Sequence, residues 1–306
     1  MATLKGKNLR VLIHNDASGS SDTWNVVGMS TNCSVQYTNN TENANHKDIV
    51  GIAQVPTVVS QACTISVDSL NVTDAAAILA AIKSLQPMLL CWDETSTTNN
   101  QTALGQNFAR KGMFYMNDVS FQFDNRTNAT KSVQFSSTGK VEALSAAPNV
   151  EVTTPGSLTK GQNIRLYLSS DNTAAPSKVI ASARTLQLHV SLSLEDATTK
   201  DTDGNWVVQE PTELTWDITT SALVRSNDVI TSQVLGQDLA AIEALKEDGL
   251  PVKGKIANAS GDNNRTAGIP IISGSLLITQ LTLNSPLESA SYETQLTGVG
   301  NYTVGA

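Results

Sequence analysis

The sequence predicts a mainly β chain made of two tandem β-sandwich domains, each with one short flanking α-helix. Three observations support this prediction: the sequence repeats itself, several repeated segments alternate apolar and polar residues, and one segment in each copy is apolar at helical spacing. Alternation is the period of a strand with one face on a core, and helical spacing marks an amphipathic helix. A repeat of this length indicates a duplicated domain.

The repeat consists of similar segments that occur in the same order in each half of the chain. The pairs are Lys5–Ile13 with Lys160–Leu168, Glu42–Asp48 with Glu195–Asp201, and Cys63–Leu70 with Trp216–Leu223. We therefore expect a first domain at residues 1–145, a linker at 146–158 and a second domain at 159–306. Each is close to the common domain size of about 100–150 residues.

Each half is expected to contain an apolar strand, an alternating strand, a third strand, a helix and two closing strands. In the first half these are Leu9–Ile13, Cys33–Thr38, Thr64–Leu70, the helix Asp74–Leu85, Phe114–Phe123 and Ser132–Ser136. In the second half they are Ile164–Leu168, Leu186–Leu194, Leu214–Leu223, the helix Asp238–Lys246, Leu276–Leu283 and Tyr292–Leu296. An insertion at residues 225–236 precedes the second helix and has no counterpart in the first half.

The helices are predicted from their apolar faces and their ends. Ile78, Leu79, Ile82 and Leu85 recur at helical spacing, so we expect this face to pack on the domain's own sheet. Asp74 is a suitable N-cap residue because its carboxylate can accept hydrogen bonds from the first helical turn. The corresponding apolar residues of the second helix are Leu239, Ile242 and Leu245.

Composition excludes several classes of protein. The chain has 20 Lys and Arg against 28 Asp and Glu, a net charge of −8, which argues against a protein that grips nucleic acid. We expect no membrane contact, because no apolar run is long enough to span a bilayer and no secretion signal is visible. The three cysteines, Cys33, Cys63 and Cys91, are predicted to be free thiols of a protein made in a reducing cytosol.

The chain shows no arrangement that predicts catalysis. It lacks a nucleophile elbow, a phosphate-cradling loop and a paired-histidine zinc motif. Its histidines (His14, His46 and His189) are scattered, and each is predicted to be a surface or interface residue. Asp201 and Asp203 resemble the start of a calcium loop, but no glutamate follows at the closing position. We therefore predict a non-enzyme that needs no cofactor and no metal.

One segment of the second half carries a family resemblance. Leu192–Trp206 ends a strand in acidic residues and continues through a Thr-Thr-Lys-Asp run to a Gly and a Trp; Glu213–Ile218 then supplies a second strand with a Trp. This order resembles the central signature of the major tail (tail tube) proteins of long-tailed phages. Lys5–Ile13 also resembles their N-terminal start. The first half keeps only Lys47-Asp48 of the signature, so it is assigned through the repeat.

The resemblance implies a structural role in a virion. Tail tube domains are β-sandwiches that assemble six to a ring around a lumen, and long loops contact neighbouring rings. A chain with two such domains would need three copies for a pseudo-hexameric ring. The rings would stack into a tail tube assembled in the host cytoplasm, which conducts DNA during ejection without binding it specifically. The other implied partners are the tape measure, tail terminator and distal tail proteins.

Two sets of candidate site residues follow from this reading. The loops at residues 38–59 and 197–211 are expected to make the ring-to-ring contact, because long irregular loops in compact domains are usually functional. Their candidate residues are Glu42, Lys47, Asp48, Glu195, Thr199, Lys200, Asp201 and Trp206. The candidate acids of the lumen wall, where negative charge would repel the DNA backbone, are Asp68, Asp118, Asp124 and Asp217.

Two other functions fit the same sequence. Tandem β-sandwich modules with few charged residues also suit an adhesin or carbohydrate-binding protein of a cell or virion surface. The inner tube of a contractile tail or injection machine would share the fold and differ in its contacts with a sheath. Self-assembly into tubes separates the first alternative from a tail tube, and a sheath-forming partner would identify the second.

Overall fold

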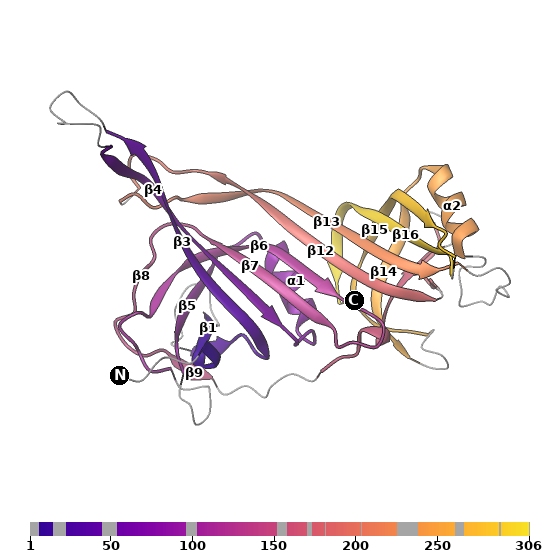
Figure 1. Cartoon of the computed structure of the whole chain (residues 1–306), viewed down its shortest axis with the longest axis horizontal. Helices are drawn as coiled ribbons and strands as arrows, with labels where there is room; N and C mark the ends of the chain where they lie inside the picture. Colours follow the sequence, from indigo (N-terminus) through magenta and orange to yellow (C-terminus); the bar gives the residue numbers. More distant parts are fainter. Residues whose placement is uncertain are drawn as a thin grey trace.

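The computed structural model describes residues 6–14, 23–44, 54–95, 103–151, 158–169, 173–180, 182–202, 204–224, 238–260, 266–287 and 289–305. In these residues the chain forms two α-helices and a 16-stranded sheet, so the prediction of a mainly β fold is confirmed. Figure 1 shows an elongated molecule in which the first half of the chain occupies one end and most of the second half the other.

The predicted strands and helices occur in the predicted order, and the structure adds strands that the sequence did not predict. In the first half they are β1 (Leu9–His14), β2 (Thr23–Val26), β3 (Ser30–Asn43), β4 (Pro56–Ser69), α1 (Ala75–Lys83), β5 (Met88–Glu94), β6 (Arg110–Gln122), β7 (Thr130–Ser137), β8 (Glu142–Ala143) and β9 (Asn149–Glu151). In the second half they are β10 (Ile164–Leu168), β11 (Lys178–Val179), β12 (Ala183–Asp196), β13 (Gln209–Leu223), α2 (Asp238–Asp248), β14 (Val252–Ser260), β15 (Thr266–Asn284) and β16 (Ser291–Val304). Short 3₁₀ helices, Gly6–Asn8 and Gly161–Asn163, precede β1 and β10.

The two halves have the same sheet order. It is β3-β4-β7-β6-β5-β1-β2 in the first half and β12-β13-β16-β15-β14-β10-β11 in the second. The register repeats as well: Val11 pairs with Trp92 as Leu166 pairs with Ile256. Even the β-bulge in β6 between Met116 and Asp118 recurs in β15 between Ile278 and Gln280. We call residues at the same register position in the two halves counterparts.

The halves are joined through one strand from each. β6 of the first half pairs antiparallel with β12 of the second, from Gln122 opposite Gln187 to Asp118 opposite Ser191. We call this pairing the intrachain joint. It merges the four strands β3, β4, β7 and β6 with β12, β13, β16 and β15 into one continuous surface of eight strands. Figure 1 shows β7, β6, β12 and β13 running side by side across the middle of the molecule.

This eight-stranded surface has one apolar face, as the alternating sequence predicts. Ile65 and Val133 of the first half and Leu188 and Ile218 of the second are at most 3% exposed. They belong to a core that is continuous across both halves. Residues on the opposite face alternate with them and are polar, which is the pattern of a sheet with one side on the core and one side in solvent.

The helices lie where the sequence places them, with two corrections. α1 ends at Lys83 rather than Leu85, because Leu85 adopts a left-handed backbone (φ 56°) and is 39% exposed. The side chain of Asp74 makes no capping hydrogen bond. It accepts instead from Nζ of Lys131, 2.6 Å away on β7, whose buried ammonium needs a carboxylate partner. In α2 the predicted Ile242 and Leu245 are buried.

Some sequence expectations concern segments near or beyond the described residues. Within the expected linker, β9 pairs with β2 in parallel, so part of that connection belongs to the sheet. The insertion at 225–236 lies outside the described residues. The three cysteines are free: Cys63 and Cys91 are buried and Cys33 is half-buried.

Candidate functional site

The most distinctive surface of the molecule is the outward face of the eight-stranded sheet, which we call the polar face. It is formed by alternate residues of six adjacent strands: 64–68 of β4, 132–136 of β7, 118–122 of β6, 187–191 of β12, 215–219 of β13 and 293–297 of β16. Among these side chains there is no lysine or arginine. The carboxylates are Asp68, Asp118, Asp217 and Glu293. The other side chains, apart from His189, are Ser, Thr and Gln, so the face is uncharged or acidic.

Three of the four acids predicted for a lumen wall lie on the polar face. Asp118 and Asp217 flank the intrachain joint, and Asp68 lies on β4, where its carboxylate accepts from Ser132 Oγ at 2.7 Å. The fourth acid, Asp124, lies beyond the strand segments that form the polar face. It lies past the end of β6 in the turn to β7, where it accepts from Gln122 Nε2 at 2.8 Å.

His189 connects the two halves at the centre of the polar face. Its Nε2 lies 2.7 Å from Oδ2 of Asp118 on β6, and its Nδ1 lies 3.1 Å from Oδ1 of Asp217 on β13. Burial alone would lower the pKa of the ring, but the hydrogen bonds and charges of the two carboxylates outweigh it and raise the pKa above its ordinary value. Because the carboxylates bind opposite sides of the ring, the three groups do not converge on one point. His189 is thus a clamp between carboxylates.

The sequence located these acids but missed the clamp. His189 was predicted only as a surface or interface residue, because its alternating strand shows which face it occupies and nothing about the strand beside it. Asp217 is its cross-strand neighbour within the predicted second half. Asp118 comes from the other half, and its position depends on the register of β6 against β12. That register has no local sequence signal.

The sheet that carries the polar face ends at two edge strands, which have no partner on their outer side among the described residues. One edge is β3, paired only with β4; the other is the C-terminal part of β15, residues 280–284, paired only with β16. These edges are the counterparts of the two strands that meet at the intrachain joint. β15 is the counterpart of β6, and β3 is the counterpart of β12.

Both edges expose apolar side chains that are buried at the intrachain joint. Phe121 of β6 and Val190 of β12 are fully buried there. Their counterparts are Leu283, which is 53% exposed, and Tyr37, which is 50% exposed. Exposed apolar residues along a free strand edge mark a surface that pairs with another chain.

The first predicted contact loop is largely strand where the structure describes it, because β3 and β4 continue as a paired hairpin to Asn43 and Pro56. The second is a loop as predicted, since β12 ends at Asp196 and only residues 209–211 belong to β13. Figure 1 shows the outer ends of the β3–β4 and β12–β13 hairpins projecting from the same end of the molecule. A long hairpin can reach a neighbour without the entropy loss of ordering an irregular loop.

The structure brings the second loop against the first hairpin. Trp206 forms a parallel bridge with Gln61 of β4, and the backbone N–H of Gln61 donates to the carbonyl of Asn205 at 2.6 Å. Trp206 is therefore half-buried within its own chain. The exposed candidates are Glu42 near the end of β3 and Glu195, Thr199, Lys200 and Asp201 near the tip of the second hairpin. Lys47 and Asp48 lie outside the described residues.

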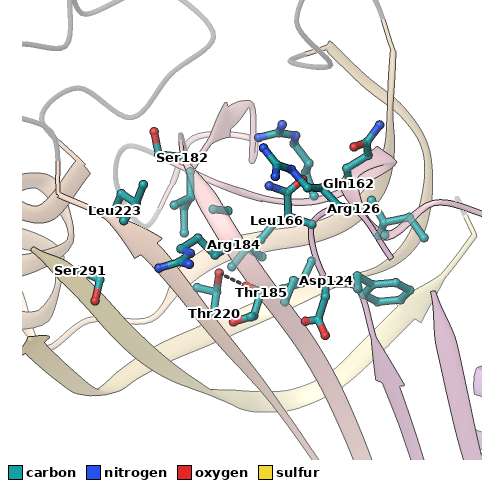
Figure 2. A pocket seen from close by; sticks show the side chains of 18 of the residues that line it. Asp124, Arg126, Gln162, Leu166, Ser182, Arg184, Thr185, Thr220, Leu223 and Ser291 are labelled. Carbon is teal, nitrogen blue, oxygen red and sulfur yellow. Dashed lines mark hydrogen bonds between the residues drawn. The ribbon is translucent and has the colours of Figure 1, made fainter. Parts of the chain in front are cut away.

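A cavity of about 980 Å³ lies between the halves, beside the intrachain joint. Figure 2 shows Asp124 and Arg126 from the β6–β7 turn on one side and Arg184 and Thr185 of β12 on the other. Oγ1 of Thr220 donates to the carbonyl of Thr185 at 2.9 Å.

Among the described residues, no group of His, Cys, Asp or Glu is arranged to hold a metal ion. Within the same residues, neither helix has the length and apolar character needed to cross a membrane.

Comparison with known proteins gives matches only among solved structures. No family model matches the sequence, and no curated protein matches it. A chain in the tail of an empty gene transfer agent (GTA) particle aligns at a TM-score of 0.38 and 16% identity, covering 48% of this chain and 99% of that chain. A chain of the native GTA virion aligns over the same shares at a TM-score of 0.37 and 16% identity.

A third solved structure is a hybrid NMR and cryo-EM model of the SPP1 tail tube. It aligns at a TM-score of 0.36 and 14% identity, covering 48% of this chain and 78% of that chain. These three solved structures are thus of a GTA tail, a GTA virion and the SPP1 tail tube.

Proposed function

We propose that the chain is the structural subunit of a phage tail tube, in which three copies close a pseudo-hexameric ring and the rings stack around a lumen that conducts DNA. The observation that carries this proposal is the intrachain joint. One half binds the other through β6 on one side and β12 on the other, which are different strands of the repeated unit. Such a head-to-tail contact repeats in one direction and closes into a ring when the rotation allows.

The free edges are suited to continue the same contact between chains. β15 forms a free edge of the sheet in the second half, at the position that β6 holds in the first half. β3 forms a free edge in the first half, at the position that β12 holds in the second half. The β15 edge of one chain would therefore pair with the β3 edge of the next, as β6 pairs with β12. Counterpart registers would place Leu283 opposite Val35 and Leu281 opposite Tyr37, as Phe121 lies opposite Leu188 and Val119 opposite Val190. Because two units are fused, each unit always has one neighbour at high effective concentration, which favours assembly.

The polar face is suited to the lumen wall. Its acidic side chains and its lack of lysine and arginine would repel the phosphate backbone, so DNA could pass without being held. In this arrangement Asp68, Asp118 and Asp217 face the lumen, and Asp124 lies at its rim. The contacts between successive rings are made by the candidate residues Glu42, Lys47, Asp48, Glu195, Thr199, Lys200, Asp201 and Trp206.

The remaining parts of the proposal follow from the family resemblance. Residues 1–145 and 159–306 are the two tube domains, joined by the linker 146–158. The tube belongs to the virion tail, assembles in the host cytoplasm, and meets the tape measure, tail terminator and distal tail proteins. The role is structural, and no catalytic activity is part of it.

Microscopy of the purified full-length chain tests this proposal. The wild type is expected to form tubes or threefold rings in negative stain. Leu283→Lys should remain monomeric, because it places a charge where the next chain's β3 would pack. The matched control is Leu104→Lys, since Leu104 is 45% exposed but lies away from both edges, and it should assemble like the wild type. Dispersed wild-type monomers would overturn the proposal and favour the adhesin alternative, and tubes formed by Leu283→Lys would exclude the β15 edge.

A further inference from the structure

The cavity beside the intrachain joint is lined by three arginines. They are Arg126 from the β6–β7 turn, Arg165 of β10 and Arg184 of β12. Figure 2 shows Arg126 and Arg184 on opposite sides of the cavity, with Asp124 lower in the view. Asp124 is the one acid among the described residues of the lining, and it already accepts a hydrogen bond from Gln122. The cavity therefore carries an excess of positive charge.

Two of these arginines have no carboxylate partner in the part of the chain that the structure describes. Arg126 and Arg184 are exposed, and neither takes part in an ion pair with a described residue. Arg126 also adopts a left-handed backbone (φ 70°), which glycine or asparagine adopts at lower cost. Two unpaired guanidiniums at one cavity are suited to bind carboxylates that come from outside the chain.

The opposite end of the hairpin that borders this cavity is acidic. β12 and β13 pair from Ala183 and Ala222, beside the cavity, to Asp196 and Gln209 at the far end. We call the far end, residues 195–213, the acidic tip. Its described residues include one lysine, Lys200, and five acids, all of them exposed: Glu195, Asp196, Asp201, Glu210 and Glu213. Figure 1 shows this end projecting from the molecule at the upper left.

Two acids of the tip repel one another within the chain. Glu195 lies directly opposite Glu210 in the register of β12 and β13, where like charges destabilise the pairing of strands. Neither glutamate forms an ion pair with a described cation, although Lys140 and Lys200 lie at the same end of the molecule. A cation supplied by another chain would relieve this repulsion.

The acidic tip and the cavity cannot meet within one chain. The length of β12 from Ala183 to Asp196 is about 40 Å at the rise of a β-strand. A contact between them must therefore join two copies head to tail, and a head-to-tail contact that does not close on itself generates an open filament.

We infer that the acidic tip of one copy docks in the arginine-lined cavity of a second copy, where Glu195 and Glu210 pair with Arg126 and Arg184. The inference rests on the proposed tube, in which this contact joins successive rings. It adds the surface that receives the tip and the chemistry of the contact, which is pairing of carboxylates with guanidiniums.

Charge reversal in the full-length chain tests this docking, with tubes and single rings counted separately in negative stain. We expect Arg126→Glu with Arg184→Glu to form rings like the wild type and to raise the protein concentration needed for tubes by about tenfold. Glu195→Arg with Glu210→Arg should have the same effect. Arg126→Lys with Arg184→Lys is the matched control, since it keeps both charges, and it should form tubes at the wild-type concentration. Circular dichroism checks that every variant is folded.

Two further measurements address the pairing itself. The variant that combines both charge reversals exchanges the places of the opposite charges, so it should form tubes close to the wild-type concentration. Added salt should separate wild-type tubes into rings, because ion pairs near the surface are screened as ionic strength rises. The apolar edge residues proposed to join chains within a ring are not screened in this way.

The outcomes separate this inference from the proposed function. A wild type that never assembles defeats the proposed tube itself. Charge-reversal variants that form tubes at the wild-type concentration overturn the docking and leave the ring standing. Variants that stay impaired when combined also overturn it, since the four residues would then act independently, as do variants that fail to form even rings. Recovery of tubes in the combined variant supports direct pairing of the tip with the cavity.

Discussion

At the scale of single residues, the two halves fill the same space with different side chains. Trp216 on β13 is 3% exposed, and its indole N–H donates to the carbonyl of Gly300 at 3.0 Å. A Cβ added to Gly298 would lie 2.1 Å from the indole ring, so only glycine fits there. The counterparts in the first half are Cys63 and Ser137, whose hydroxyl accepts from the backbone N–H of Cys63 at 2.9 Å. In the second half a large side chain, Trp216, thus packs beside a glycine, whereas at the same position in the first half a small side chain, Cys63, packs beside a serine.

Because the two residues of each pair fit one another, we predict that replacing one of them by its counterpart from the other half destabilises the chain. Gly298→Ser, which installs the residue of the first half, should destabilise the chain by roughly 1–3 kcal/mol, because it overpacks the indole site. Urea unfolding of the wild type and the variant measures the difference. Thr297→Ser at the exposed neighbouring position is the control, and it should change stability by less than about 0.5 kcal/mol. Equal stability of Gly298→Ser and the wild type would contradict the packing.

At the scale of strands and helices, the sequence predicted where the elements lie better than which distant residues they contact. Apolar alternation located β12 and helical spacing located α1 and α2, because these signals lie within one segment. The end of α1 was placed two residues too late, since Leu85 fits the apolar pattern but adopts a left-handed backbone after the helix has ended. Asp74 was read as a cap because the buried Lys131 that binds it lies on a distant strand.

The intrachain joint predicts a dependence on pH. The pKa of His189 is raised in the folded chain, so its contribution to stability is fully present below the unfolded pKa of about 6.5 and is lost as pH rises through the folded value. Asp118 on β6 and Asp217 on β13 are the carboxylates that face it. Unfolding free energy should therefore fall when pH is raised from about 6 to about 8.

Replacing His189 by glutamine, the residue at the counterpart position Gln36, isolates this effect. The His189→Gln variant should lose less stability than the wild type over the same pH interval, as measured by urea unfolding at each pH. The two proteins are otherwise identical, so the difference between their pH dependences reports on His189. An equal fall in the two proteins would show that the clamp does not contribute.

At the scale of the whole molecule, the sequence revealed that the domain is duplicated but did not reveal how the two copies are arranged. Similar segments such as Lys5–Ile13 and Lys160–Leu168 revealed the repeat because they survive in the sequence itself. The pairing of β6 with β12 depends on which edge of one unit meets which edge of the next. Edge residues such as Phe121 and Leu188 look like ordinary core residues, so the sequence gives them no separate signal.

The shared core predicts cooperative unfolding of the two halves. β6 pairs with β12, α1 packs on β16, and one apolar core spans both halves. Calorimetry of the unassembled chain, kept monomeric by Leu283→Lys, should therefore give a single transition whose calorimetric and van't Hoff enthalpies agree. Two resolved transitions would mean that the halves unfold independently and that the joint contributes little.

The fusion of two units in one chain has a mechanical consequence for a closed ring. Three seams would lie inside polypeptides, where β6 already pairs with β12, and three would lie between separate polypeptides, at the free edges of β15 and β3. A tube that is bent or stretched would then yield first at every second seam. Its compliance would follow a threefold pattern even though its strands are arranged almost sixfold.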